Sequence, residues 1–291
     1  MQKSLNVGAN MGIEETEVKK QYLHIFFTKY LQFAKTEAVA SVAKGRNYDI
    51  IKYLYSLFVE ISKDKTEAQK VEKEIKELDE QLKDFEKENK DIPSISIIEV
   101  STRRGYLHTT LSPNSDLSHA FQLLVISMNK YKIWRKNLSE EALKEIYKRN
   151  LLDKQRFYFK DPPEDLNKEL LSQTLVARNY VLRQSLIEFY NGISHLNAAF
   201  WNTGDKEDNV KKAKHHFQRG ALDSYKAIIK DFSLMLGSQN DEPRQKFLKK
   251  IANIRQKEYQ TIGFEKKRNE DISLYQEYEK LVDAILQLQK K

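Results

Sequence analysis

The sequence contains no cysteine, and it has only 9 glycines and 5 prolines among its 291 residues. The absence of cysteine excludes disulfide bonds, thiolate-bound zinc and cysteine nucleophiles. Glycine and proline are too scarce for the many turns of a β-sandwich or barrel. A hydrophobic content of 40% with 11% aromatic residues is too high for an intrinsically disordered chain. These proportions predict a folded, mainly α protein.

Long hydrophobic runs are also missing. No stretch of about eighteen uninterrupted apolar residues occurs, so we expect no membrane-spanning segment and no membrane partner. The first residues lack the apolar region of a secretory signal. Together with the lack of cysteine, this predicts a cytoplasmic protein.

Two segments have apolar residues spaced alternately three and four positions apart, which is typical of a coiled coil. The first seam consists of Ile61, Ala68, Val71, Ile75, Leu78, Leu82 and Phe85, and the second of Leu117, Phe121, Leu124, Met128, Tyr131, Trp134 and Leu138. Because each seam needs an apolar partner, we predict that the two helices pack against each other as a long antiparallel hairpin.

The connection between the two seams has the pattern of a small β ribbon. Residues 94–101 alternate and are rich in isoleucine, residues 102–105 form a turn signal, and residues 106–111 can return as a second strand. The sequence therefore predicts a two-stranded ribbon at the tip of the hairpin.

Helices are also predicted on both sides of the hairpin. Residues 14–43 and 49–61 have helical spacing, and the second of these is expected to continue into the coiled coil. Pro162 and Pro163 forbid a continuing helix, so the chain is divided there into residues 1–160 and 161–291. The second part is predicted to be an up-and-down helical bundle. Its four helices are expected at about 165–200, 206–236, 243–260 and 268–290.

Positive charge exceeds negative charge, with 50 lysines and arginines against 42 aspartates and glutamates. The excess is uneven along the chain. Basic residues dominate residues 130–160 and 244–268, whereas the first seam helix, between Glu60 and Asp91, is acidic. A patchy basic surface favours contact with a polyanion such as nucleic acid.

Searches for catalytic and metal-binding motifs give little. Glycine-rich phosphate loops, zinc-binding HExxH helices and nucleophile elbows are all missing, so no cofactor, metal ion or catalytic residue is predicted. His215 and His216 point about 100° apart on a helix and cannot chelate one ion from a single face. We expect His215 to be solvated and His216 or Phe217 to point inward. The chain is therefore interpreted as a protein without enzymatic activity.

Basic side chains at two places are the candidate DNA contacts. Arg103 and Arg104 occupy the turn of the predicted ribbon, and a group of basic residues flanks the end of the second seam. That group is Lys130, Lys132, Arg135 and Lys136. A further basic stretch contains Lys249, Lys250, Arg255, Lys257, Lys266, Lys267 and Arg268. Contacts to phosphate require density of charge rather than a motif.

Residues 49–159 resemble the AcaB-like proteins of integrating conjugative elements and plasmids. The shared features are a Lys/Glu-rich seam helix at 71–85, the Ile-Ser-Ile-Ile-Glu-Val-Ser strand at 95–101 and a long helix with a tryptophan at 117–138. This resemblance implies a role in conjugative transfer and a relation to ribbon-helix-helix DNA binders. It implies that Tyr106, His108 and Thr110, or the turn arginines, contact DNA.

Three hypotheses follow. The first is a basic, non-enzymatic accessory or regulatory protein that binds duplex DNA and is encoded by a mobile genetic element. The second is an interaction or scaffold protein that docks a partner protein or a second copy through the hairpin. The third, more remote, is a helical ribonuclease, because Arg103 and His108 have the spacing of an HEPN-type motif. Steep salt dependence of binding would favour the first over the second.

Overall fold

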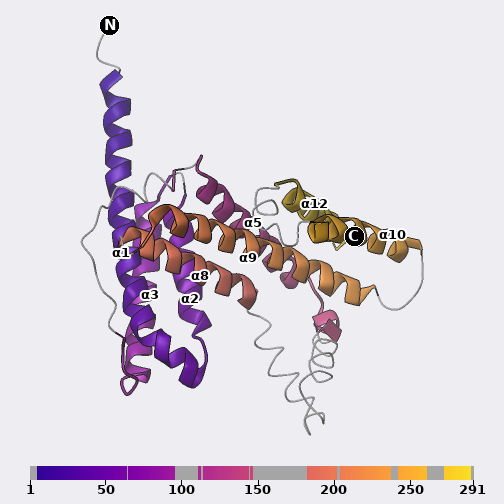
Figure 1. The fold of residues 1–291 in the computed structure, drawn as a ribbon, viewed down its shortest axis with the longest axis horizontal. Helices are drawn as coiled ribbons and strands as arrows, with labels where there is room; N and C mark the ends of the chain where they lie inside the picture. The colour runs from indigo at the N-terminus through magenta and orange to yellow at the C-terminus, as the bar shows by residue number, and fades with distance from the viewer. Residues whose placement is uncertain are drawn as a thin grey trace. The chain divides into compact units, whose positions relative to one another are not determined.

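The computed structural model describes residues 5–63, 65–95, 111–112, 114–143, 145–146, 182–201, 204–236, 242–260 and 272–289 (Figure 1). The prediction of a mainly α protein is confirmed. The helices are α1 (Leu5–Lys44), α2 (Tyr48–Ile61), α3 (Ala68–Glu88), α5 (Asp116–Lys136), α8 (Arg183–Phe200), α9 (Lys206–Met235), α10 (Glu242–Gln260) and α12 (Ile272–Leu288). None of the helices in the described ranges is long and apolar enough to cross a membrane.

Local signals set the boundary between α1 and α2. Gly45 follows α1 with φ at +87°, in the left-handed region that glycine adopts without a steric penalty. Asn47 then caps α2, because its side-chain oxygen accepts a hydrogen bond from the backbone N–H of Ile50 at 3.0 Å. Its own N–H donates to the buried carboxylate of Glu37 at 3.2 Å, which ties the start of α2 to α1.

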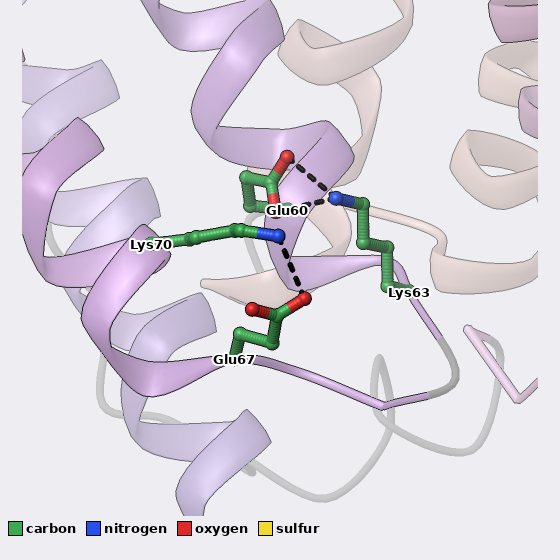
Figure 2. A network of polar contacts seen from close by, with 4 residues as sticks. All are labelled: Glu60, Lys63, Glu67 and Lys70. Carbon is green, nitrogen blue, oxygen red and sulfur yellow. Dashed lines mark hydrogen bonds and ion pairs between the residues drawn. The ribbon is translucent and has the colours of Figure 1, made fainter.

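The predicted continuation of residues 49–61 into the coiled coil is wrong. α2 ends at Ile61, the chain turns, and α3 begins at Ala68, so α2 and α3 form a helical hairpin of their own. Figure 2 shows the local ion pairs on either side of this turn: Lys63 contacts Glu60 at 2.6 Å, and Lys70 contacts Glu67 at 2.8 Å. Serine, aspartate and threonine, which occur between the two helices, have lower helix propensities than the lysines and glutamates around them. The carbonyl of Lys63 also accepts a hydrogen bond from Nζ of Lys19 of α1 at 3.1 Å.

The two seams pack on different helices. α3 packs against α2 and α1, where the rings of Phe85 and Phe33 lie 5.2 Å apart. In the second seam, the ring of Phe121 instead packs against those of Phe58 of α2 and Phe217 of α9, with ring centroids 4.9 and 5.2 Å apart. The seam positions are mostly buried as expected, but the pairing of one seam with the other is not what fills them.

The predicted β ribbon lies almost entirely outside the described residues, and no strand occurs in the ranges that the structure describes. Its first residues follow α3 along α1: the backbone N–H of Ile95 donates to the carbonyl of Lys35 at 2.9 Å, and the hydroxyls of Ser94 and Thr36 are 2.9 Å apart. The ribbon remains a prediction.

The chain forms two compact units, each built from two separate segments. Unit 1 contains residues 1–123 and 186–217, and unit 2 contains residues 124–185 and 218–291. The expected division at residue 160 lies outside the described residues. Unit 1 has an aromatic core that includes Phe58, Phe121 and Phe217, and in unit 2 α10 packs on α12.

Candidate functional site

The structure describes half of the predicted DNA contacts. Arg103, Arg104, His108 and Thr110 lie outside the described residues, so their positions stay predictions. The other four residues belong to the last turns of α5, in unit 2. Two of them, Lys130 and Arg135, are paired or buried, and the other two, Lys132 and Lys136, are exposed.

Arg135 is a buried residue rather than a surface one. Its side chain is 4% exposed, and its Nη1 lies 3.3 Å from Oδ2 of Asp231 in α9, whose side chain is 8% exposed. The indole Nε1 of Trp134 donates to the same oxygen at 3.4 Å. Burial raises the pKa of Asp231, and the charge of Arg135 opposes that rise. Because Arg135 is held inside the protein, its expected contact with DNA has no support here, and its evident role is to fix α5 on α9.

Lys130 also forms ion pairs within the protein. Its Nζ lies 2.8 Å from Oε1 of Glu279 and also contacts the carboxylate of Asp283, both in α12. Two carboxylates around one partly buried ammonium leave no excess positive charge at this position. Lys130 therefore connects α5 to α12.

Lys132 and Lys136 remain as exposed cations. They are four residues apart on α5, so their Cβ atoms are about 5–6 Å apart on one face, and neither forms an ion pair with the described residues. Lys230 of α9 is also exposed, and it directly precedes Asp231, the ion-pair partner of Arg135. We name Lys132, Lys136 and Lys230 the lysine cluster.

A second buried carboxylate organises the other helices of unit 2. Glu258 of α10 contacts Lys226 of α9 and Arg255, and it accepts a hydrogen bond from the hydroxyl of Tyr278 of α12 at 2.6 Å. Burial raises the pKa of Glu258, but the hydrogen bonds from Lys226 and Tyr278 and the charges of Lys226 and Arg255 outweigh it and lower the pKa. Glu258 is thus held ionised and joins three helices.

The third feature of unit 2 is a groove of about 610 Å³ between α10 and α12. Ile254, Leu281 and Ala284 supply its apolar surface. Its basic lining residues are Lys250, Lys257 and Lys280, and its other polar lining residues are Asn253, Gln256, Gln260 and Glu277. We call this feature the α10–α12 groove.

In unit 1, the structure explains the adjacent histidines. Phe217 is fully buried, as expected for one of the residues next to the pair. Nδ1 of His216 lies 2.7 Å from Oε2 of the buried Glu188, and the ring of His216 stacks on that of His195 at 5.3 Å. Among the residues that the structure describes, no group of three or more histidines and carboxylates could hold a metal ion.

Sequence reasoning missed Lys230 and Lys280 as members of basic sites. Lys280 is the single lysine of α12, and Lys230 is one of six lysines in α9. Both lie outside the basic stretches at 130–160 and 244–268, so local density of charge did not mark either of them. The basic stretch that contains Lys250 and Lys257 marked the α10 side of the groove in the sequence. No sequence pattern indicated the apolar surface that α12 contributes.

Comparison of the chain with models of protein families, with curated proteins and with solved structures gave no match.

Proposed function

We propose that the chain is a non-enzymatic accessory or regulatory protein that binds duplex DNA, and that the lysine cluster of unit 2 contacts the phosphate backbone. The observation that carries this proposal is the unequal pairing of charge in unit 2. The carboxylates Asp231, Glu258, Glu279 and Asp283 each form an ion pair within unit 2, whereas the lysines of the cluster form no ion pair with the described residues.

Lysines on a regular helix suit contact with phosphates rather than with bases. Each ammonium that neutralises a phosphate releases condensed counterions, which gives binding without sequence selectivity. The two lysines of α5 are fixed relative to α9 by the buried Arg135–Asp231 pair, so the cluster is held in place before DNA binds.

The test measures binding of a generic labelled duplex by fluorescence anisotropy between about 50 and 200 mM salt. The triple variant Lys132→Gln, Lys136→Gln and Lys230→Gln should weaken binding and reduce the slope of log affinity against log salt by about two to three, since each lost phosphate contact contributes about 0.9. Binding of a scrambled duplex should be weakened by the same factor.

A matched control changes the same charge elsewhere. Lys76, Lys83 and Lys87 are exposed on α3 in unit 1 and form no ion pair with the described residues. The triple glutamine variant of these three lysines should bind DNA much as the unchanged protein does. Equal losses of affinity in the two triple variants would show that only net charge matters and would overturn the lysine cluster as the contact site.

The predicted ribbon is a second DNA contact in this proposal. It is supported by the resemblance to AcaB-like proteins, which also suggests that the gene belongs to a mobile element. The variant Arg103→Ala with Arg104→Ala should weaken binding of duplex DNA. If its affinity equals that of the unchanged protein, the ribbon does not contact DNA and the lysine cluster stands alone.

A further inference from the structure

We propose that the α10–α12 groove binds an acidic amphipathic helix of a partner protein. This surface is distinct in residues from the lysine cluster, so the proposal goes beyond DNA binding. It rests on the volume, the apolar surface and the charge of the groove.

The groove has the size and the lining of a recognition site. A volume of about 610 Å³ lies within the range of about 300–1,000 Å³ that is usual for ligand sites. Ile254 and Leu281 are 7% and 6% exposed and form its base, and Ala284 has a small side chain that leaves space above it. An apolar base of this kind gains free energy by burying aliphatic side chains and would desolvate a phosphate at a cost.

The charge of the lining selects an acidic occupant. Glu277 is already paired with Lys257, so its charge is neutralised within the wall. Lys250 and Lys280 are exposed, line the groove from α10 and α12 respectively, and form no ion pair with the described residues. A partner with carboxylates on both sides of an apolar stripe would match this arrangement.

The shape of the groove favours a helix. From Lys250 to Gln260 it follows α10 for about 15 Å, which is the length of a ten-residue helix. Laying an amphipathic helix with its apolar face into a groove between two helices is a recurring mode of recognition. The walls are prepared for it, because the hydrogen bond from Tyr278 to Glu258 and the Lys257–Glu277 pair fix α12 against α10.

The experiment uses a fluorescein-labelled peptide of about fourteen residues, with leucines at helical spacing on one face and glutamates beside them. Its binding to the full chain is measured by anisotropy, together with that of an otherwise identical peptide whose glutamates are lysines. The acidic peptide should bind the unchanged protein at least about tenfold more tightly than the basic one, because every flanking charge changes sign.

Two variants separate the apolar contribution from the charge contribution. Ala284→Phe fills the groove and should weaken the acidic peptide about tenfold or more while leaving affinity for duplex DNA unchanged. Lys250→Glu with Lys280→Glu should reverse the preference in favour of the basic peptide. Lys249→Glu is the control for charge, since Lys249 is exposed on α10, does not line the groove and forms no ion pair with the described residues.

Three results would overturn the proposal. The first is equal affinity for the acidic and basic peptides, and the second is an unchanged preference in the Lys250→Glu, Lys280→Glu variant. The third is a pair of results: duplex DNA displaces the acidic peptide, and Ala284→Phe loses DNA binding. Together they would assign the groove to nucleic acid. Loss of DNA binding in the lysine-cluster variant with retained peptide binding would leave the groove proposal intact.

Discussion

Replacing Arg135 with alanine should destabilise unit 2 rather than abolish contact with DNA. The guanidinium lies 3.3 Å from Asp231 with both side chains almost fully buried, so the gross attraction is about 5 kcal/mol at an effective dielectric constant of about 20. Removing one partner of a buried pair leaves the other charge uncompensated and costs about 3–5 kcal/mol. We expect the free energy of unfolding to fall by about 3 kcal/mol, at the lower end of this range, because Asp231 can take up a proton and so lose its uncompensated charge.

The loss of stability should depend on pH in a defined direction. Burial already raises the pKa of Asp231, and loss of Arg135 raises it further. A carboxyl group whose pKa is higher in the folded state binds a proton more tightly there, so its penalty is relieved as the pH falls through the folded pKa. The deficit of the Arg135→Ala variant should therefore be smaller at about pH 5 than at about pH 7.

Urea unfolding followed by tryptophan fluorescence measures both quantities, since Trp134 lies beside the altered residue and donates to Asp231. Lys136→Ala is the control, and its stability should change by less than about 0.5 kcal/mol, as is usual for an exposed position. A loss below about 1 kcal/mol for Arg135→Ala, or a loss of the same size at both pH values, would refute the assignment of Arg135 to a buried ion pair.

Two further substitutions test the packing of each unit by the same unfolding measurement. Gly192→Ala would place a Cβ 2.5 Å from the ring of Phe217, so it should cost about 1–2 kcal/mol despite the better helix propensity of alanine, and a stabilised variant would contradict this close approach. Glu258→Gln should cost about 1–2 kcal/mol near neutral pH, since Lys226 and Arg255 lose their charge partner while Tyr278 keeps an acceptor. Hydrogen bonds and nearby cations lower the pKa of Glu258 against the effect of burial, so the stabilisation by its carboxylate is lost as the pH falls through that lowered pKa. A stability deficit of Glu258→Gln that persists in acid would contradict this role of the ionised carboxylate.

Periodicity predicted which side chains are buried better than it predicted what they touch. Val71, Leu78, Leu82 and Phe85 are buried at the spacing that identified the first seam. The spacing describes only one face of one helix, so a partner such as Phe33 of α1 is equally compatible with it. The break before Ala68 was missed because it contains neither glycine nor proline.

The candidate site shows a related limit of sequence reasoning. Arg135 and Lys136 are adjacent and equally basic, yet one is buried and the other exposed. What distinguishes them is Asp231, a residue in another helix, and no local pattern reports that contact. Density of charge pointed to the end of α5 but could not tell a structural cation from a surface one.

The construction of each unit from two separate segments has a consequence for folding during synthesis. Phe121 of unit 1, which contacts Phe58, also packs against Phe217, and Phe217 emerges from the ribosome long after both. At about 5–20 residues per second, the chain between residues 123 and 217 takes roughly 5–20 s to synthesise. During that interval the nascent N-terminal helices expose apolar rings without all of their partners, so unit 1 can complete its core only after residue 217 has left the ribosome.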